Sequence, residues 1–196
     1  ENLSKWTIDD EDLNDENTFK IIYIGSIRLF NNVRLLVEAA EKLQSKKDMV
    51  FLIYGDGDER KPLEEYVRKK NIQNVRFKDT FIDKKYIPHL LSKSSINVLN
   101  YQQNGIWKYG GSQSKLFQYL ASGKPIVSNI VPGYCLIKQH ECGISSEFTT
   151  ADEYASAFES LRNLSEKEYL IMCNNSRKAA QSFDYKKLTD SLITLL

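Results

Sequence analysis

FKIIYIGSIRLFNNVRLLVEAAEKLQSKKDMVFLIYG, residues 19–55, decides the fold of this chain. Residues 19–25 form a run that is apolar except for Lys20 and ends at a glycine, and residues 49–55 form a similar apolar run. Between them, residues 33–44 carry apolar side chains at helical spacing. A strand that is apolar at nearly every position is buried on both faces. The unit therefore predicts a parallel sheet covered by helices on both sides.

The same alternation of strands and helices continues to the end of the chain. Four further short strands are expected at 74–79, 96–101, 125–130 and 142–147. Helices are expected at 59–71, 84–94, 114–123, 151–164, 165–183 and 185–196. Pro88 requires a late start or a kink in its helix, and Gly123 is a typical helix end. Residues 19–196 are thus predicted to form one α/β domain with a Rossmann-like, doubly wound parallel sheet, which binds ligands at the carboxyl ends of its strands.

The first 18 residues, ENLSKWTIDDEDLNDENT, differ from the remainder because they are acidic and lack a core pattern. They are predicted to be a linker, or a tail from a preceding domain. The first residue is Glu1 rather than Met, so we expect a fragment that lacks an N-terminal domain.

Composition excludes several classes of protein. A net charge of +1 gives no electrostatic signature of nucleic-acid binding. Three scattered cysteines without a CxxC pair and only two histidines argue against a disulfide framework and against a His-rich metal site. The sequence has no acidic cluster that marks a metal, no signal peptide and no apolar run of bilayer length, so we expect a cytoplasmic protein.

The segment YGGSQSKLFQ (109–118) is the most informative candidate site. Two glycines free the backbone just before a helix, and a helix N-terminus offers unpaired N–H groups that suit a phosphate. Neutral donors and one cation follow the glycines: Ser112, Gln113, Ser114 and Lys115. Gln118, one turn further on, is placed to reach a sugar hydroxyl. The alternative is a helix cap by Ser112 or Ser114 with no ligand.

Two other loops follow strands and are candidates for ligand contact. In GSIRLFNN (25–32), Gly25 permits close approach of the backbone, Ser26 donates a hydroxyl and Arg28 can pair with phosphate. The alternative is a plain turn in which Asn32 caps the next helix. In the loop at 102–109, aromatic side chains either stack on a ligand ring or pack the loop down. We find no catalytic residue in any of these segments.

Residues 19–183 resemble the C-terminal, donor-binding domain of GT-B-fold retaining glycosyltransferases of family 4 (glycosyl transferases group 1). Four segments carry the resemblance: FKIIYIGSI with LLVEAAEKL, FLIYGDGDERKPLEEYV, NVRFKDTFIDKKYIPHLLSKSSINVL, and SKLFQYLASGKPIVSN with ECGI. Within that group the chain is most similar to bacterial enzymes of capsule or O-antigen assembly.

The resemblance implies sugar transfer from a nucleoside-diphosphate sugar to a glycan or lipid-linked acceptor, with no cofactor and no metal. It implies a diphosphate site over the first loop and the helix start, at Gly25, Ser26, Arg28, Gly111, Ser112, Gln113, Ser114, Lys115 and Leu116. The ribose would meet Gln118, and the base would contact Thr80 and Phe81. It also implies a partner N-terminal domain and a cytoplasmic location, in some members peripheral at the inner membrane face.

The chain departs from the family pattern at the acidic pair. Many members carry two glutamates separated by seven residues, where this chain has Gly110 and Gln118. Many also carry an arginine and a lysine in the first loop, where Ser26 and Asn31 stand. Two alternatives therefore stay open: a non-catalytic nucleotide-sugar-binding domain, and a GT-B-fold sugar-nucleotide 2-epimerase.

Overall fold

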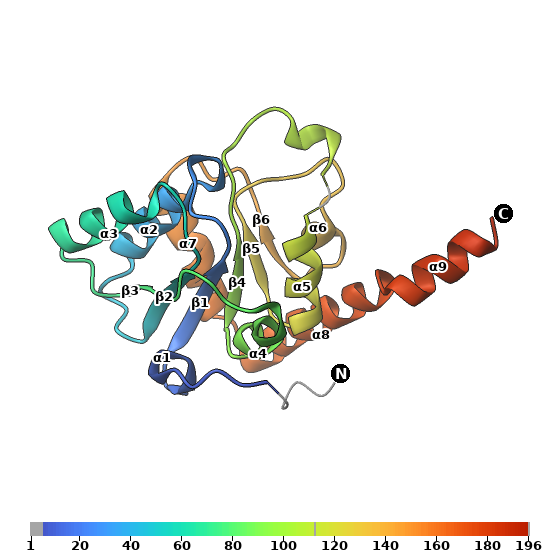
Figure 1. Cartoon of the computed structure of the whole chain (residues 1–196), viewed down its shortest axis with the longest axis horizontal. Helices are drawn as coiled ribbons and strands as arrows, with labels where there is room; N and C mark the ends of the chain where they lie inside the picture. Colours follow the sequence, from blue (N-terminus) through green and yellow to red (C-terminus); the bar gives the residue numbers. More distant parts are fainter. Residues whose placement is uncertain (1–5, 112, 196) are drawn as a thin grey trace.

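A six-stranded parallel sheet forms the centre of the protein in this computed structural model, which describes residues 6–111 and 113–195 (Figure 1). The strands lie in the order β3-β2-β1-β4-β5-β6. Their bounds are β1 Phe19–Ile24, β2 Met49–Tyr54, β3 Val75–Phe77, β4 Ile96–Leu99, β5 Ile126–Ser128 and β6 Gly143–Ser145. All six expected strands are confirmed, and so is the Rossmann-like fold. The order reverses between β1 and β4, which is the topological switch point of the sheet.

Helices cover both faces of the sheet because successive strand residues point to opposite sides. In β1, Ile21 and Tyr23 join the core beneath one helical layer, whereas Ile22 joins the core on the other side. The first layer contains α2 Val33–Lys42, α3 Arg60–Lys69 and α7 Ala151–Arg162. The second contains α1 Glu11–Asn14, α4 Ile87–Ser92, α5 Ser114–Ser122, α6 Leu136–Gln139 and α8 Glu166–Ser182.

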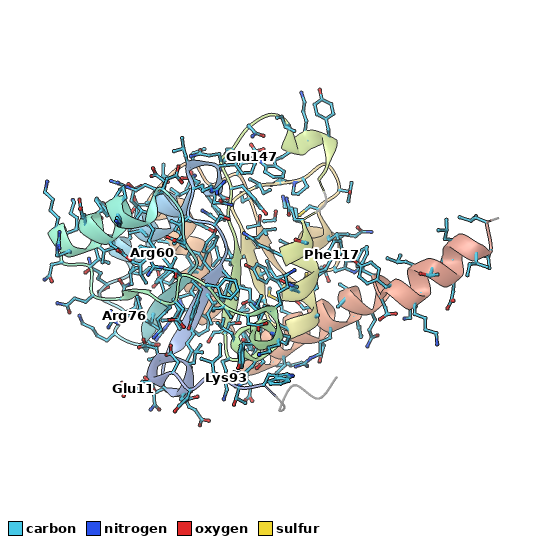
Figure 2. All side chains as sticks on the ribbon, viewed as in Figure 1. Glu11, Arg60, Arg76, Lys93, Phe117 and Glu147 are labelled. Carbon is cyan, nitrogen blue, oxygen red and sulfur yellow. The ribbon has the colours of Figure 1, made fainter. Side chains whose placement is uncertain are left out.

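The last helix, α9 (Tyr185–Ile193), continues from α8 and projects away from the sheet (Figure 1). None of its residues is buried, and its side chains extend into the surroundings (Figure 2). It lies where a closing helix was expected, but it packs on neither helical layer in the part of the chain that the structure describes.

Local sequence explains where α4 starts, whereas tertiary contacts explain why α6 forms. The helix expected at 84–94 begins late, as Pro88 requires: residues 84–86 form a 3₁₀ turn and α4 starts at Ile87. The short helix α6 has no counterpart among the expected helices. Leu136 and Ile137 are buried against α5, so packing stabilises a helix too short to show a periodic pattern.

The acidic N-terminal segment packs on the domain rather than extending from it. Leu13 in α1 is 1% exposed and lies in a core cluster with Ile22 and Leu90. Asp10 and Asp12 form ion pairs with Lys78 at 2.8 and 2.7 Å. No local sequence pattern indicates this docking, because one leucine among acids shows no periodicity. The boundary between residues 18 and 19 stays a prediction, since a linker can also pack against a domain.

Replacement of Leu13 by Ala tests whether this segment belongs to the folded unit. We expect the free energy of unfolding to fall by about 2–4 kcal/mol in urea denaturation, because a fully buried side chain is removed. Glu11→Gln, on the exposed side of the same helix, should change it by less than about 0.5 kcal/mol. Equal values for the two variants would contradict the packing of α1.

Candidate functional site

Lys115 of α5 reaches across the switch point to the end of β1. A Cβ atom on Gly25, the residue after β1, would collide with the Nζ atom of Lys115. The same amine lies 5.2 Å from the ring centroid of Tyr23 and 5.9 Å from that of Tyr101. The structure therefore brings Gly25 and Lys115 together, although 90 positions separate them, and it holds the amine between two aromatic rings.

The amine of Lys115 is a cation that has lost much of its hydration. Burial lowers the pKa of Lys115 to about 8. No ion pair with a carboxylate offsets this in the described part of the chain. Burial also raises the pKa of the neighbouring Tyr23 well above its usual value, so this phenol stays neutral. A bound anion would stabilise the charged form of Lys115, because an opposite charge favours protonation.

The start of α5 adds hydrogen-bond donors beside this cation. The N–H of Leu116 donates to the carbonyl of Gln113 at 2.9 Å. The N–H groups of Ser114 and Lys115 find no acceptor among residues 6–111 and 113–195. Free N–H groups and the positive end of a helix dipole favour an anion at this place. Ser112, also expected here, lies outside the described residues.

The first loop supplies close backbone approach but little charge. The N–H of Gly25 donates to the carbonyl of Tyr54 at 3.0 Å, and a Cβ on Gly55 would collide with the carbonyl oxygen of Gly25. Ser26 is exposed, and its carbonyl accepts the Tyr23 hydroxyl at 2.7 Å. Arg28 is also exposed, and no contact joins it to Lys115 in the described part of the protein.

The expectation that Asn32 caps α2 is confirmed in position but not in hydrogen bonding. Asn32 does occupy the position before α2, but its φ is +46° and its side chain makes no capping bond there. Its carbonyl and that of Asn31 instead accept the Asn100 amide at 2.5 and 2.9 Å. The Asn100 Oδ1 atom accepts the Tyr154 hydroxyl at 2.9 Å. Asn100 therefore fixes the first loop to β4 and α7, a role that no local sequence signal reveals.

Aromatic side chains hold down the loop that leads to α5. The Trp107 ring lies 5.0 Å from that of Tyr101 and 6.1 Å from that of Phe30, and its Nε1 donates to the carbonyl of Gln102. Packing is thus the structural role of Trp107. Tyr109 is 80% exposed and stays a candidate for ligand contact.

The two positions of the missing acidic pair lie in different surroundings. Gly110 has a φ of +90°, and a Cβ there would lie 2.7 Å from Cε1 of Tyr134, so a glutamate fits only if Tyr134 moves. Gln118 is exposed on α5 and lines a groove of about 310 Å³ beside α4, with Lys84 and Ile87. Thr80 and Phe81 are exposed in the loop that precedes α4, and neither lines this groove.

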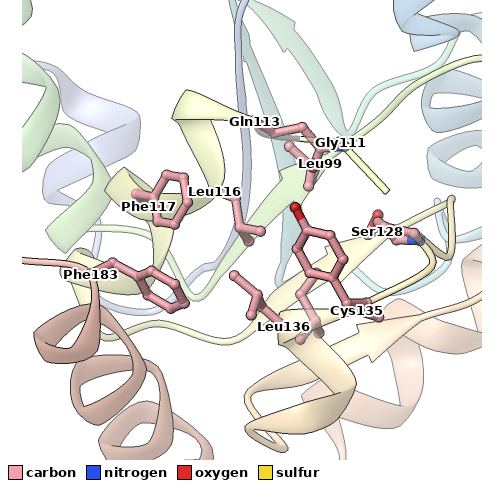
Figure 3. A pocket seen from close by; sticks show the side chains of 12 residues that line it. Leu99, Gly111, Gln113, Leu116, Phe117, Ser128, Cys135, Leu136 and Phe183 are labelled. Carbon is pink, nitrogen blue, oxygen red and sulfur yellow. The ribbon is translucent and has the colours of Figure 1, made fainter. Parts of the chain in front are cut away.

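Gln113 has a feature that sequence reasoning missed. Its side chain is 7% exposed, yet neither Oε1 nor Nε2 has a hydrogen-bond partner within the described residues. An unpaired buried polar group costs roughly 1–3 kcal/mol. Together with Gly111 and Leu116, Gln113 lines a cavity of about 100 Å³ beside α5 (Figure 3).

Three further features bear on metal binding and on membrane attachment. The three cysteines are free thiols. No cluster of His, Cys, Asp and Glu suited to a metal ion occurs among the described residues. No helix in the same residues is long and apolar enough to cross a bilayer. The expected absence of a metal and the cellular location remain predictions.

Known proteins resemble this chain in sequence and in fold. The family model described as glycosyl transferases group 1 matches residues 4–181. An alpha-D-kanosaminyltransferase of Streptomyces kanamyceticus is 27% identical over 72% of this chain and 36% of its own. A 2-deoxystreptamine N-acetyl-D-glucosaminyltransferase of Niallia circulans is 29% identical over 55% of this chain and 26% of its own. The chain therefore spans well under two thirds of these relatives.

One solved structure shows the likeness of fold. HepE of Anabaena, in complex with UDP-glucose, matches with a TM-score of 0.74 at 15% identity. The match covers 98% of this chain and 55% of HepE.

The buried amine of Lys115 predicts a specific pH dependence of stability. Its pKa is about 8 in the folded state and near 10.5 when unfolded, so its unfavourable burial is fully present below pH 8 and is lost as the pH rises towards 10.5. Relative to Lys115→Met, the free energy of unfolding of the native protein should therefore rise by on the order of 2–3 kcal/mol between pH 7.5 and 10.5. Chemical denaturation across this range measures it.

The matched control is Lys61→Met, which removes an exposed lysine from α3. The free energy of unfolding of Lys61→Met should change with pH in the same way as that of the native protein. A parallel course for Lys115→Met as well would show that the Lys115 amine is not desolvated.

Proposed function

Because the chain belongs to the glycosyl transferases group 1 family, we propose that it binds a nucleoside-diphosphate sugar as the donor domain of a glycosyltransferase. The observation that carries the proposal is the Lys115 amine, which lies over Gly25 at the switch point beside free N–H groups of α5. A diphosphate is the part of such a donor that needs this environment, because it is an anion with several acceptor oxygens.

The proposed chemistry is stabilisation of the leaving group. As the bond between the anomeric carbon and the phosphate oxygen breaks, negative charge grows on the nucleoside diphosphate. The ammonium group of Lys115 and the N–H groups of Ser114 and Lys115 would face that charge in a site with little water, where fixed donors act most strongly. Arg28 is exposed, and we propose that its guanidinium group also contacts the phosphates when they bind.

The finer features of the proposal rest on family likeness. We propose a UDP-sugar as the donor, since the structure of the fold relative HepE is a complex with UDP-glucose. On the likeness of the motifs we also propose transfer with retention of configuration. The proposed acceptor is a glycan or lipid-linked saccharide of a bacterial capsule or O-antigen, and the proposed place of action is the inner membrane face. The residues that bind the acceptor are proposed to lie on a separate N-terminal domain.

A second candidate is a domain that binds sugar nucleotides without catalysing transfer. The position of Gly110 favours it, because Tyr134 occupies the space in which a glutamate side chain would lie. The two candidates share the same nucleotide site and differ in turnover alone. Assay of the full-length protein for sugar transfer or donor hydrolysis separates them.

Titration of the chain with UDP, GDP, ADP and their common sugar conjugates tests the proposed site. We expect one nucleotide to bind selectively, and Lys115→Ala to weaken its binding by about 1–3 kcal/mol, because a charge-assisted contact is lost. Calorimetry at pH 7 measures both effects. Lys61→Ala, on the exposed side of α3, serves as the control and should leave the affinity unchanged. Unaltered affinity in Lys115→Ala would remove Lys115 from the site.

Gln118→Glu tests whether this side chain reads the ribose. A carboxylate accepts hydrogen bonds from hydroxyls more strongly than an amide does, so UDP should bind equally well or up to about tenfold more tightly. The gain should be smaller with 2′-deoxy-UDP, which lacks one of the hydroxyls. A tenfold loss of affinity for both nucleotides would show that the site is built around a neutral group at position 118, and an unchanged affinity for both would show that Gln118 does not face the ribose.

A further inference from the structure

The segment before α1 is attached to α4 by a hydrogen bond to a histidine. It runs along α4 (Figure 1), and the backbone N–H of Ile8 donates to Nδ1 of His89 at 3.2 Å, across 81 positions of the chain. An imidazole nitrogen accepts a hydrogen bond only when it carries no proton. The contact therefore requires the neutral form of His89, with its proton on Nε2. A protonated imidazole has two N–H donors and no acceptor, so it cannot make this bond.

The charged groups around His89 disfavour its protonated form in the folded protein. Burial lowers the pKa of His89 from its usual value, and the cation of Lys93, one turn further along, lowers it further. Lys85, in the turn before α4, is a cation too, and it pairs with an aspartate of its own turn. The acids of the facing segment have other partners, because Asp9 accepts from an asparagine amide and Asp10 forms the ion pair described above. His89 is therefore neutral at pH 7.

Few other contacts hold the segment before α1. The ring of Trp6 lies 6.3 Å from that of Tyr86, edge to face, and the Lys85 amine lies 4.9 Å from the centroid of the Trp6 ring. Trp6 is 44% exposed, and none of residues 6–9 is fully buried. One hydrogen bond is therefore a large part of what holds these residues against the turn at 84–86.

We propose that His89 is a pH-sensitive switch for the docking of residues 6–9. While the imidazole is neutral, it accepts the Ile8 N–H and holds the segment against α4. When Nδ1 takes up a proton from solvent, the hydrogen bond breaks and residues 6–9 leave the domain, whereas α1 stays docked through Leu13. The inference does not depend on the proposed function, since neither Ile8 nor His89 belongs to the anion site.

The direction of the pH dependence follows from the bond. Only the neutral imidazole docks the segment, so docking is complete above the usual pKa of a histidine and is lost as the pH falls through the pKa of His89 in the folded protein. The carboxylates of Asp10 and Asp12, which pair with Lys78, hold α1 through separate contacts.

NMR between about pH 7.5 and about pH 5 tests the inference. In the ¹⁵N-labelled chain, the amide signal of Ile8 and the indole signal of Trp6 should shift with the same midpoint as the ring signals of His89. Corrected for the intrinsic rate, hydrogen exchange of the Ile8 amide should become about tenfold faster as His89 is protonated, because one hydrogen bond is lost. The methyl signals of Leu13 should not move over this range.

Two substitutions at position 89 separate the loss of this bond from general effects of acid. His89→Asn offers an amide oxygen near the place of Nδ1, and this oxygen does not titrate, so residues 6–9 should stay docked at both ends of the pH range. His89→Leu removes the acceptor, so the Ile8 amide should exchange rapidly at both ends. His140→Asn replaces the other histidine of the chain, and its response to pH should match that of the native protein.

Two results would overturn the inference. An Ile8 amide signal that does not follow the titration of His89 would show that the segment is held without this bond. The same pH response in His89→Leu as in the native protein would assign the release to the carboxylates of Asp10 and Asp12. Neither result bears on the proposed function, because nucleotide binding at pH 7 is measured separately.

Discussion

A desolvated ammonium group at the switch point of the sheet is the constraint on which the remaining features of the site depend. Lys115 cannot extend into solvent without leaving the rings of Tyr23 and Tyr101, and its position over Gly25 requires a residue without a side chain there. Ring faces attract a cation but accept no hydrogen bonds of normal strength. Burial without hydrogen-bond acceptors lowers the pKa of the amine. An anion at the start of α5 would supply acceptors and raise this pKa.

The scaffold around the amine is rigid because its parts are joined by buried polar contacts. Asn100 connects the turn after β1 to the end of β4, and the hydroxyl of Tyr154 connects the same amide to α7. On the other side, the N–H of Gly25 is tied to the carbonyl of Tyr54 on β2. Three strands and a helix thus determine where the backbone at Gly25 lies, so a ligand placed by that backbone meets Lys115 at a fixed distance.

The sequence predicts those features that depend on local pattern. Short, mainly apolar runs predict the six strands, Pro88 predicts the late start of α4, and the two glycines predict the start of α5 that follows them. The anion site at this helix start stays a prediction. Features that arise from contacts between distant segments leave no such pattern. The docking of Leu13, the helix around Leu136 and the network around Asn100 each need a partner from elsewhere in the chain. The unpaired amide of Gln113 is of this kind too, because the same residue on an open helix start would be hydrated.

The missing acidic pair and the lowered pKa of Lys115 are both consistent with an amine that has no carboxylate as its counter-ion in the described part of the chain. A carboxylate beside the amine would act as its counter-ion and would raise its pKa. This chain has Gly110 beneath Tyr134 and the neutral Gln118 at the two positions, so the site carries its positive charge uncompensated.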